Sequence, residues 1–250
     1  MEKSIYGVVV VLILSASSCS KEKKPGYDST GALAAVVKSV THSNTGTTVN
    51  YVYDTNGRIQ LIQSSNGVKT TFEYADSLLT QTELDKTGNI VSVAYLTLDS
   101  RGLVSNSVVK DANGAVVSNH TYVFDDQKQL TAVYNYTPNN DVNGKTEWAW
   151  GSGNMYNYSI YDSAITHKAF DSYLWYYEPA ITSVGNANTG RKFLGADSKY
   201  LIRKTIGYTW GAANVVSTFD YVFDSLHRVI ETKTYDHNGL LKNTDSYTYY

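Results

Sequence analysis

The stretch Tyr53-Asp54-Thr55-Asn56-Gly57-Arg58-Ile59 indicates the fold, because this order of residues is typical of a tight β-hairpin turn. The Asp side chain can bond to the backbone two residues on, and Gly supplies the positive φ that such a turn needs. Related phrases recur at 98–103, 124–130, 223–229 and 235–240. The recurrence predicts a long antiparallel meander, whose structural turn residues include Asp54, Gly57, Asp99, Gly102, Asp224, Asp236 and Gly239.

The composition of the chain also favours β structure. It holds 22 Tyr and 18 Gly but only 3 Pro, and β-branched and aromatic residues suit a pleated surface. In 215–223, Phe219, Tyr221 and Phe223 alternate with a mixed second face. We expect further strands at 47–53, 69–74, 90–98, 115–124, 130–136 and 229–235.

These patterns predict one all-β domain over residues 35–250. Turn signals mostly ten to fourteen residues apart indicate an up-and-down meander of roughly a dozen or more strands. The meander is expected to form a curved sheet or an open barrel, and the sequence leaves closure undecided. The aromatic last strand, 245–250, is compatible with a membrane barrel, but charges in strands such as 220–224 oppose a lipid-facing wall.

The first residues predict a lipoprotein signal peptide over 1–18. The apolar run at 6–14 is too short to span a membrane, and small residues precede Cys19, the only cysteine. These flanks resemble a bacterial lipobox, with Ala16 where Leu is more usual. The resemblance implies lipidation at Cys19 and membrane attachment through a polar tether at 19–34, although an incidental thiol is the alternative.

The phrase at 53–59 resembles the YD repeat of Rhs-type proteins. The whole chain is similar to Bacteroidetes lipoproteins of an uncharacterised domain family with a porin-like fold. The turn at Asp76 departs from the pattern by one residue, and the phrase at 124–130 has Lys or Gln in place of Gly. The resemblance implies a β meander, whereas the chain is too short for the shell that Rhs repeats form around a toxin.

The middle segment, about 137–199, interrupts the repeat and is rich in aromatic residues. If the chain binds a ligand, we expect the contact here, because exposed Trp and Tyr rings stack on sugars and other planar surfaces. The candidate residues are Trp148, Trp150, Trp175 and Tyr176. Alternation as in Trp148-Ala149-Trp150 equally fits rings that point into the core of the sheet.

No motif predicts catalysis, a cofactor or a metal site. Gly151-Ser152-Gly153 lacks the strand, nucleophile and helix order of a hydrolase, and the five histidines show no metal-ligand spacing. A formal charge of −2 gives no basic surface for nucleic acid.

We therefore expect a non-enzymatic lipoprotein of the outer membrane, on its periplasmic or cell-surface side, that binds a glycan or a protein partner. A purely structural or assembly role is the alternative. An extracellular glycan-processing enzyme would need two carboxylates in one cleft.

Overall fold

The computed structural model describes residues 36–165, 168–176, 189–198, 200–209, 215–226 and 228–250. The predicted signal peptide, the tether and Cys19 lie outside these residues. The described part contains sixteen strands and a short 3-10 helix. They are β1 Val37–His42, β2 Thr47–Tyr53, β3 Ile59–Ser64, β4 Lys69–Ala75, β5 Leu78–Leu84, β6 Ile90–Leu98, β7 Val104–Asp111, β8 Val116–Phe124, β9 Leu130–Tyr136, β10 Val142–Gly151, β11 Asn154–Tyr161, β12 Lys168–Tyr176, η2 Lys192–Leu194, β13 Ile202–Thr209, β14 Val215–Phe223, β15 Val229–Tyr235 and β16 Leu241–Tyr249.

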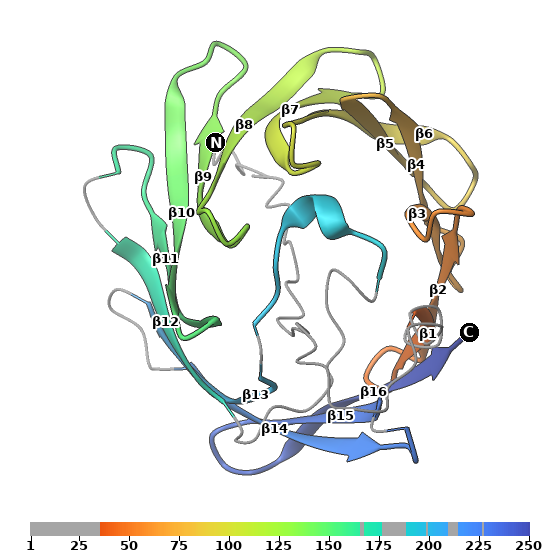
Figure 1. Ribbon diagram of the computed structural model, residues 1–250, viewed down its shortest axis with the longest axis vertical. Helices are drawn as coiled ribbons and strands as arrows, with labels where there is room; N and C mark the ends of the chain where they lie inside the picture. The colour runs from red at the N-terminus through yellow and green to blue at the C-terminus, as the bar shows by residue number, and fades with distance from the viewer. Residues whose placement is uncertain (1–35, 166–167, 177–188, 199, 210–214, 227) are drawn as a thin grey trace, which may run out of the picture.

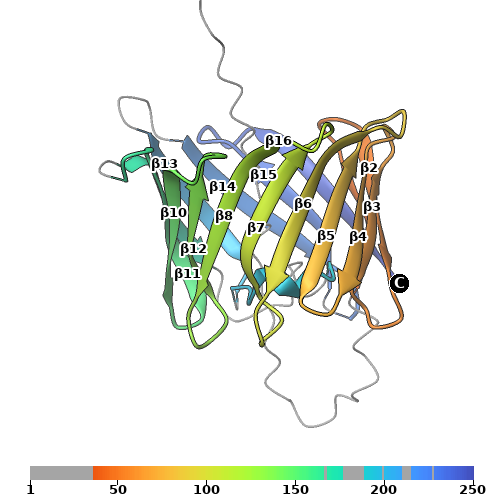
Figure 2. The same cartoon turned by 90° about the horizontal axis from the view of Figure 1, so that it is seen from above.

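The strands form a closed barrel of strictly up-and-down topology. Each strand pairs antiparallel with its neighbours in the chain, and β1 also pairs with β16 through Val40 opposite Tyr247 and Thr41 opposite Ser246 (Figures 1 and 2). The predicted all-β meander is confirmed, and the question of closure, which the sequence left open, is answered by this seam.

The Asp-containing turns share one geometry. At the β2–β3 turn, Asp54 Oδ1 accepts hydrogen bonds from the backbone N–H groups of Asn56 and Arg58, both at 2.9 Å, and Gly57 has a φ of +70°. The register shifts by one residue beside this turn, between Val52 and Tyr53. Similar shifts occur beside the turns at Asp99, Asp224 and Asp236. Because bulges increase strand twist, their repetition curves the sheet toward closure.

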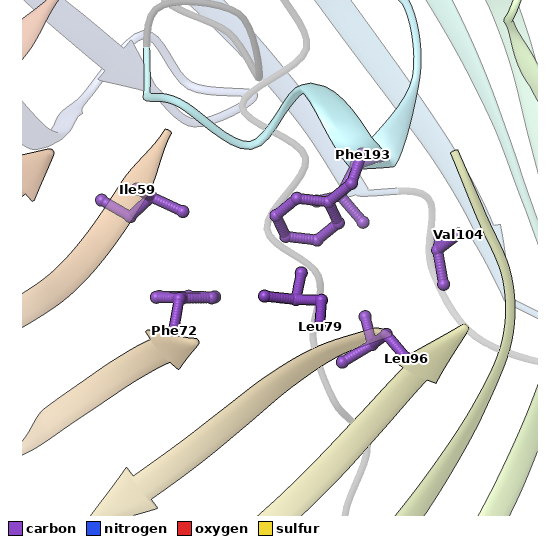
Figure 3. Close-up of a cluster of buried hydrophobic side chains, with 7 residues drawn as sticks. Ile59, Phe72, Leu79, Leu96, Val104 and Phe193 are labelled. Atoms are coloured by element: carbon purple, nitrogen blue, oxygen red, sulfur yellow. The ribbon is translucent and has the colours of Figure 1, made fainter. Parts of the chain in front are cut away.

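The inner face of the barrel carries the core. Side chains of β3 to β7 pack against Phe193 and Leu194 of η2 (Figure 3), and this short helix lies inside the ring of strands (Figure 1). The buried residues of this cluster are Ile59, Phe72, Leu79, Leu96, Val104, Phe193 and Leu194. A second cluster joins Val37, Val40, Leu201 and Val229, with Tyr221 and Phe223 of the predicted aromatic face packed against it.

The residues 189–201, where described, form an internal segment that docks on the strand ends. The backbone N–H of Ile59 donates to the carbonyl of Gly190 at 3.2 Å, and that of Ala196 donates to Lys128 at 2.7 Å. A β-carbon at Gly190 would lie 2.7 Å from the Ile59 nitrogen. The segment and the barrel rim are therefore in close backbone contact.

Polar inner side chains pair across neighbouring strands. His42 Nδ1 lies 2.6 Å from Asp245 Oδ1 across the β1–β16 seam, and Asn243 donates to the same oxygen. Ser92 donates to Glu83 at 2.9 Å. Most inner polar groups are thus paired within the wall, and the buried Ser64 Oγ and Tyr74 hydroxyl oxygen are the exceptions among the described residues.

The outer wall is mixed and charged. Asp220 lies on the outward side of β14, since Tyr221 next to it packs inward, and its cross-strand partner is Lys233. Glu73 likewise alternates with the buried Phe72. A lipid-facing wall disfavours such charges. Among the described residues, no helix has the length and apolar character needed to cross a membrane.

Candidate functional site

Four aromatic side chains form an exposed aromatic strip on the outside of β11, β12 and β13. Tyr173 and Trp175 alternate with the buried Ser172 and Leu174, so both rings face outward. Between 41% and 50% of the surface of each strip residue is exposed. The strip consists of Tyr156, Tyr173, Trp175 and Tyr208.

Contacts within the strip hold its rings in place. Tyr173 and Tyr208 pack edge to face with centroids 6.0 Å apart, and Lys204 Nζ lies 5.8 Å from the Trp175 ring centroid. Tyr156 is the extra residue of a β-bulge in the β10–β11 pair, and its ring covers Gly151. The bulge adds a residue to β11 and so turns an aromatic ring outward.

A polar cluster borders the strip. Asp171, whose cross-strand partner is Tyr208, accepts hydrogen bonds of 2.7 Å each from Asn157 and Ser159. Burial alone would raise the pKa of Asp171, but these hydrogen bonds and the Lys168 charge outweigh it and the pKa is lowered. The carboxylate is therefore ionised at neutral pH and oriented beside the strip.

A second polar group lies across β11 from Asp171. Lys145 forms an ion pair with Glu147, and its Nζ lies 5.0 Å from the Tyr134 ring centroid. The hydrogen bond from Lys145 lowers the pKa of Glu147, and Tyr161 adds to the effect. A glycosidase acid instead requires a raised pKa. Glu147 and Asp171 are thus both ionised at neutral pH and act as hydrogen-bond acceptors.

The structure divides the four sequence-predicted aromatic candidates between the two faces of the wall. Trp175 faces outward in the strip. Trp148, Trp150 and Tyr176 face inward: Trp150 Nε1 donates to the Leu130 carbonyl at 2.8 Å, and the Tyr176 hydroxyl contacts Ser198 at 3.0 Å. Burial raises the pKa of Tyr176 to about 12.

Sequence reasoning did not single out Tyr173, Tyr208 or Tyr156 as site residues. Tyr173 and Trp175 share a strand face by simple alternation, but so do Trp148 and Trp150, and the pattern alone does not say which pair faces water. Tyr208 lies outside the aromatic middle segment and reaches the strip only because β13 pairs with β12.

The described residues contain no group of three or more His, Cys, Asp or Glu side chains that could hold a metal ion. Of the histidines, His42 bonds to Asp245 and His120 to Ser107, each on the inner wall. His167 and His227 lie outside the described residues.

Two solved structures share this fold over nearly their whole length. A porin-like protein from Bacteroides uniformis superposes with a TM-score of 0.65 and 18% identity, covering 86% of this chain and 98% of the other. A porin-like protein from Bacteroides vulgatus gives a TM-score of 0.56 and 11% identity, covering 86% and 99%. No protein-family model and no curated protein matches the chain. At these identities the likeness establishes the barrel fold alone.

Proposed function

We propose that this chain is a cell-envelope lipoprotein that binds a glycan, without catalysis, on the aromatic strip. The observation that carries the proposal is the strip itself: Tyr173, Trp175 and Tyr208 are each more than 40% exposed on two adjacent strands. Exposed ring surface is unfavourable in water, and burying it against a partner stabilises the complex by roughly 25 cal/mol per Å².

The neighbouring polar groups favour a sugar as that partner. Aromatic rings pack on the C–H faces of a sugar while its hydroxyls need donors and acceptors at the ring edge. The Lys204 ammonium beside Trp175 supplies donors, and the ionised Asp171 beside Tyr208 supplies acceptors. The lowered pKa values of Glu147 and Asp171 support binding rather than proton transfer.

The anchoring part of the proposal rests on the sequence around Cys19. The resemblance to a lipobox implies acyl chains that hold the protein on the outer membrane. A charged outer wall, with Asp220 beside Lys233, supports a barrel that stands in water next to the membrane. Whether the protein faces the periplasm or the cell surface depends on which of the two compartments contains the glycan that it binds.

A structural or assembly role is the second candidate function, and exposed apolar residues elsewhere on the outer wall favour it. Val117 on β8 and Val123 near the end of the same strand are each more than 40% exposed. In that case the strip is a protein-binding surface, because aromatic residues are also enriched at such interfaces.

Affinity electrophoresis of the intact protein in mild detergent tests the proposal, with gels containing xylan, starch, galactomannan or solubilised peptidoglycan. The double variant Trp175→Ala and Tyr173→Ala should weaken retention by on the order of tenfold or more, since each ring contributes about 1 kcal/mol. Tyr95→Ala is the matched control, because Tyr95 is exposed on β6 with Lys110 Nζ 5.4 Å from its ring centroid, as Lys204 lies by Trp175. Equal retention of both variants and the wild type would refute the strip as the site.

A further inference from the structure

A groove of about 510 Å³ lies on the barrel wall over β7, β8 and the β9–β10 turn, away from the aromatic strip. Its outward lining comes from strand residues that alternate with the inner Ser107 and His120. Besides Val108 and Val116, that lining consists of residues with an amide, a hydroxyl or a ring: Asn106, Asn119, Thr121, Tyr136, Pro138 and Asn140.

The groove is bounded by a turn that differs from the Asp-x-x-Gly turns of the repeat. Thr137 N–H donates to the Asp141 carbonyl at 2.8 Å, and Asn140 takes a φ of +65° without being glycine. This conformation brings Asn140 Oδ1 within 2.8 Å of Asn119 Nδ2. On the far side, Thr121 donates to Asn106 Oδ1 at 3.2 Å. Side-chain amides therefore line the groove from two sides.

The chemistry of the lining selects an uncharged ligand. The lining contains no Asp, Glu, Lys or Arg, and the ring of His120 points to the inner face. Amides and hydroxyls both donate and accept, as the hydroxyls of a neutral sugar require. Tyr136 and Pro138 add apolar surface against which a sugar ring can pack.

We infer that this groove is a second glycan-binding subsite, for neutral sugar units, and that the ligand is an extended chain laid across the strands of the outer wall. The inference rests on the proposed function of the strip. From β8 to β12 is four strand spacings, about 19 Å along the wall. Tyr134, Lys145 and Tyr161 lie on the outer wall between the two sites. A short oligosaccharide fills one site, and a longer chain contacts both.

The test uses the intact protein with cello-, xylo- and malto-oligosaccharides from disaccharide to octasaccharide, titrated by calorimetry. Wild-type affinity should rise steeply at the length that reaches both sites. The double variant Asn119→Ala and Asn106→Ala should bind short chains as the wild type does and lose on the order of tenfold for long chains. Asn50→Ala is the control, since Asn50 is exposed on β2 beyond the groove.

The two proposals fail differently. If the groove variant matches the wild type at every length while the strip variant is impaired, the second subsite is refuted and the strip stands. If the groove variant alone is impaired, the strip is refuted instead.

A second measurement covers the case in which no oligosaccharide gives heat. The side-chain amide NMR signals of Asn106, Asn119 and Asn140 should shift on addition of cellohexaose and xylohexaose and not on addition of a hexapeptide of alanine and serine. Signals that stay fixed with both sugars, or that respond to the peptide alone, would overturn the inference.

Discussion

At the scale of the residue, the recurring turn aspartates make the fold sensitive to acid. The Thr87 hydroxyl and backbone N–H bonds lower the pKa of Asp85 to about 2, and the Lys242 ammonium with similar bonds lowers that of Asp236 to about 2. The carboxylates are favoured in the folded state, whereas an unfolded Asp titrates near 3.9. Their stabilisation is therefore complete above pH about 4 and is lost as the pH falls toward 2.

Urea unfolding at a series of acid pH values checks this expectation. The midpoint should be level above pH about 4 and fall below it, and the double variant Asp85→Asn and Asp236→Asn should show a shallower fall. A variant that loses stability with acid as steeply as the wild type would contradict the role assigned to these carboxylates.

Lys128 gives a second prediction at this scale. It has a φ of +63° at the turn position where related phrases have Gly, such as Gly57 and Gly102. A left-handed backbone costs a residue with a β-carbon roughly 1–2 kcal/mol, so Lys128→Gly should raise the free energy of unfolding by about 0.5 to 1 kcal/mol. Lys69→Gly, in an extended strand, should lower it, and denaturant titration separates the two outcomes.

The sequence carries much of this residue-level information. An Asp that bonds its own turn is a local feature, and the Lys at the glycine position is visible as a departure from the repeat. Which aromatic rings face water is not local. Tyr208 and Trp175 meet through strand pairing, which no single stretch of sequence encodes.

At the scale of the element, the internal segment can be tested through two glycines of equal backbone conformation. Gly190 and Gly57 have φ values of +69° and +70°, but a β-carbon at Gly190 would lie 2.8 Å from the Tyr53 ring, whereas one at Gly57 meets nothing within 4 Å. Gly57→Ala should cost about 1 kcal/mol for the backbone alone. Gly190→Ala should cost about 1–3 kcal/mol more, for the clash.

Thermal and denaturant unfolding of the two variants measures this difference. If both variants lost the same free energy of unfolding, the residues near Gly190 would not dock on the barrel rim as described.

Strands were predictable because their signal is periodic and local. The expected strands at 47–53, 90–98, 130–136, 215–223 and 229–235 coincide with β2, β6, β9, β14 and β15. The internal segment was not predicted. Phe193 and Leu194 sit in a short irregular stretch without periodicity, and only the barrel around them gives them a place to bury.

At the scale of the whole molecule, buried tyrosines predict unfolding at alkaline pH. Burial raises the pKa of Tyr74 to about 12 and raises those of Tyr53, Tyr247 and Tyr249 as well. The neutral ring is favoured in the folded state, so this stabilisation is complete below pH about 10 and is lost as the pH rises through about 12.

The sequence did not determine whether the barrel closes, because the β1–β16 seam joins residues some two hundred positions apart.

Tyrosinate absorbance and circular dichroism, followed together, test the alkaline prediction. The exposed tyrosines should ionise first, while the circular dichroism signal of the β-sheet is intact. The buried tyrosines should ionise only as that signal disappears. A single ionisation step that leaves the β signal unchanged would contradict the burial of these rings.

The most direct test of glycan binding on the aromatic strip is tryptophan fluorescence of the wild type and Trp175→Phe, with acrylamide quenching and glycan titration. Trp175 is 44% exposed, so the wild type should have a quenchable component that responds to a glycan retained in the gels. The quenchable component should shrink and the glycan response should disappear in Trp175→Phe, even if the phenyl ring preserves some binding. A glycan response that persists unchanged in this variant would place the ligand elsewhere and contradict the account.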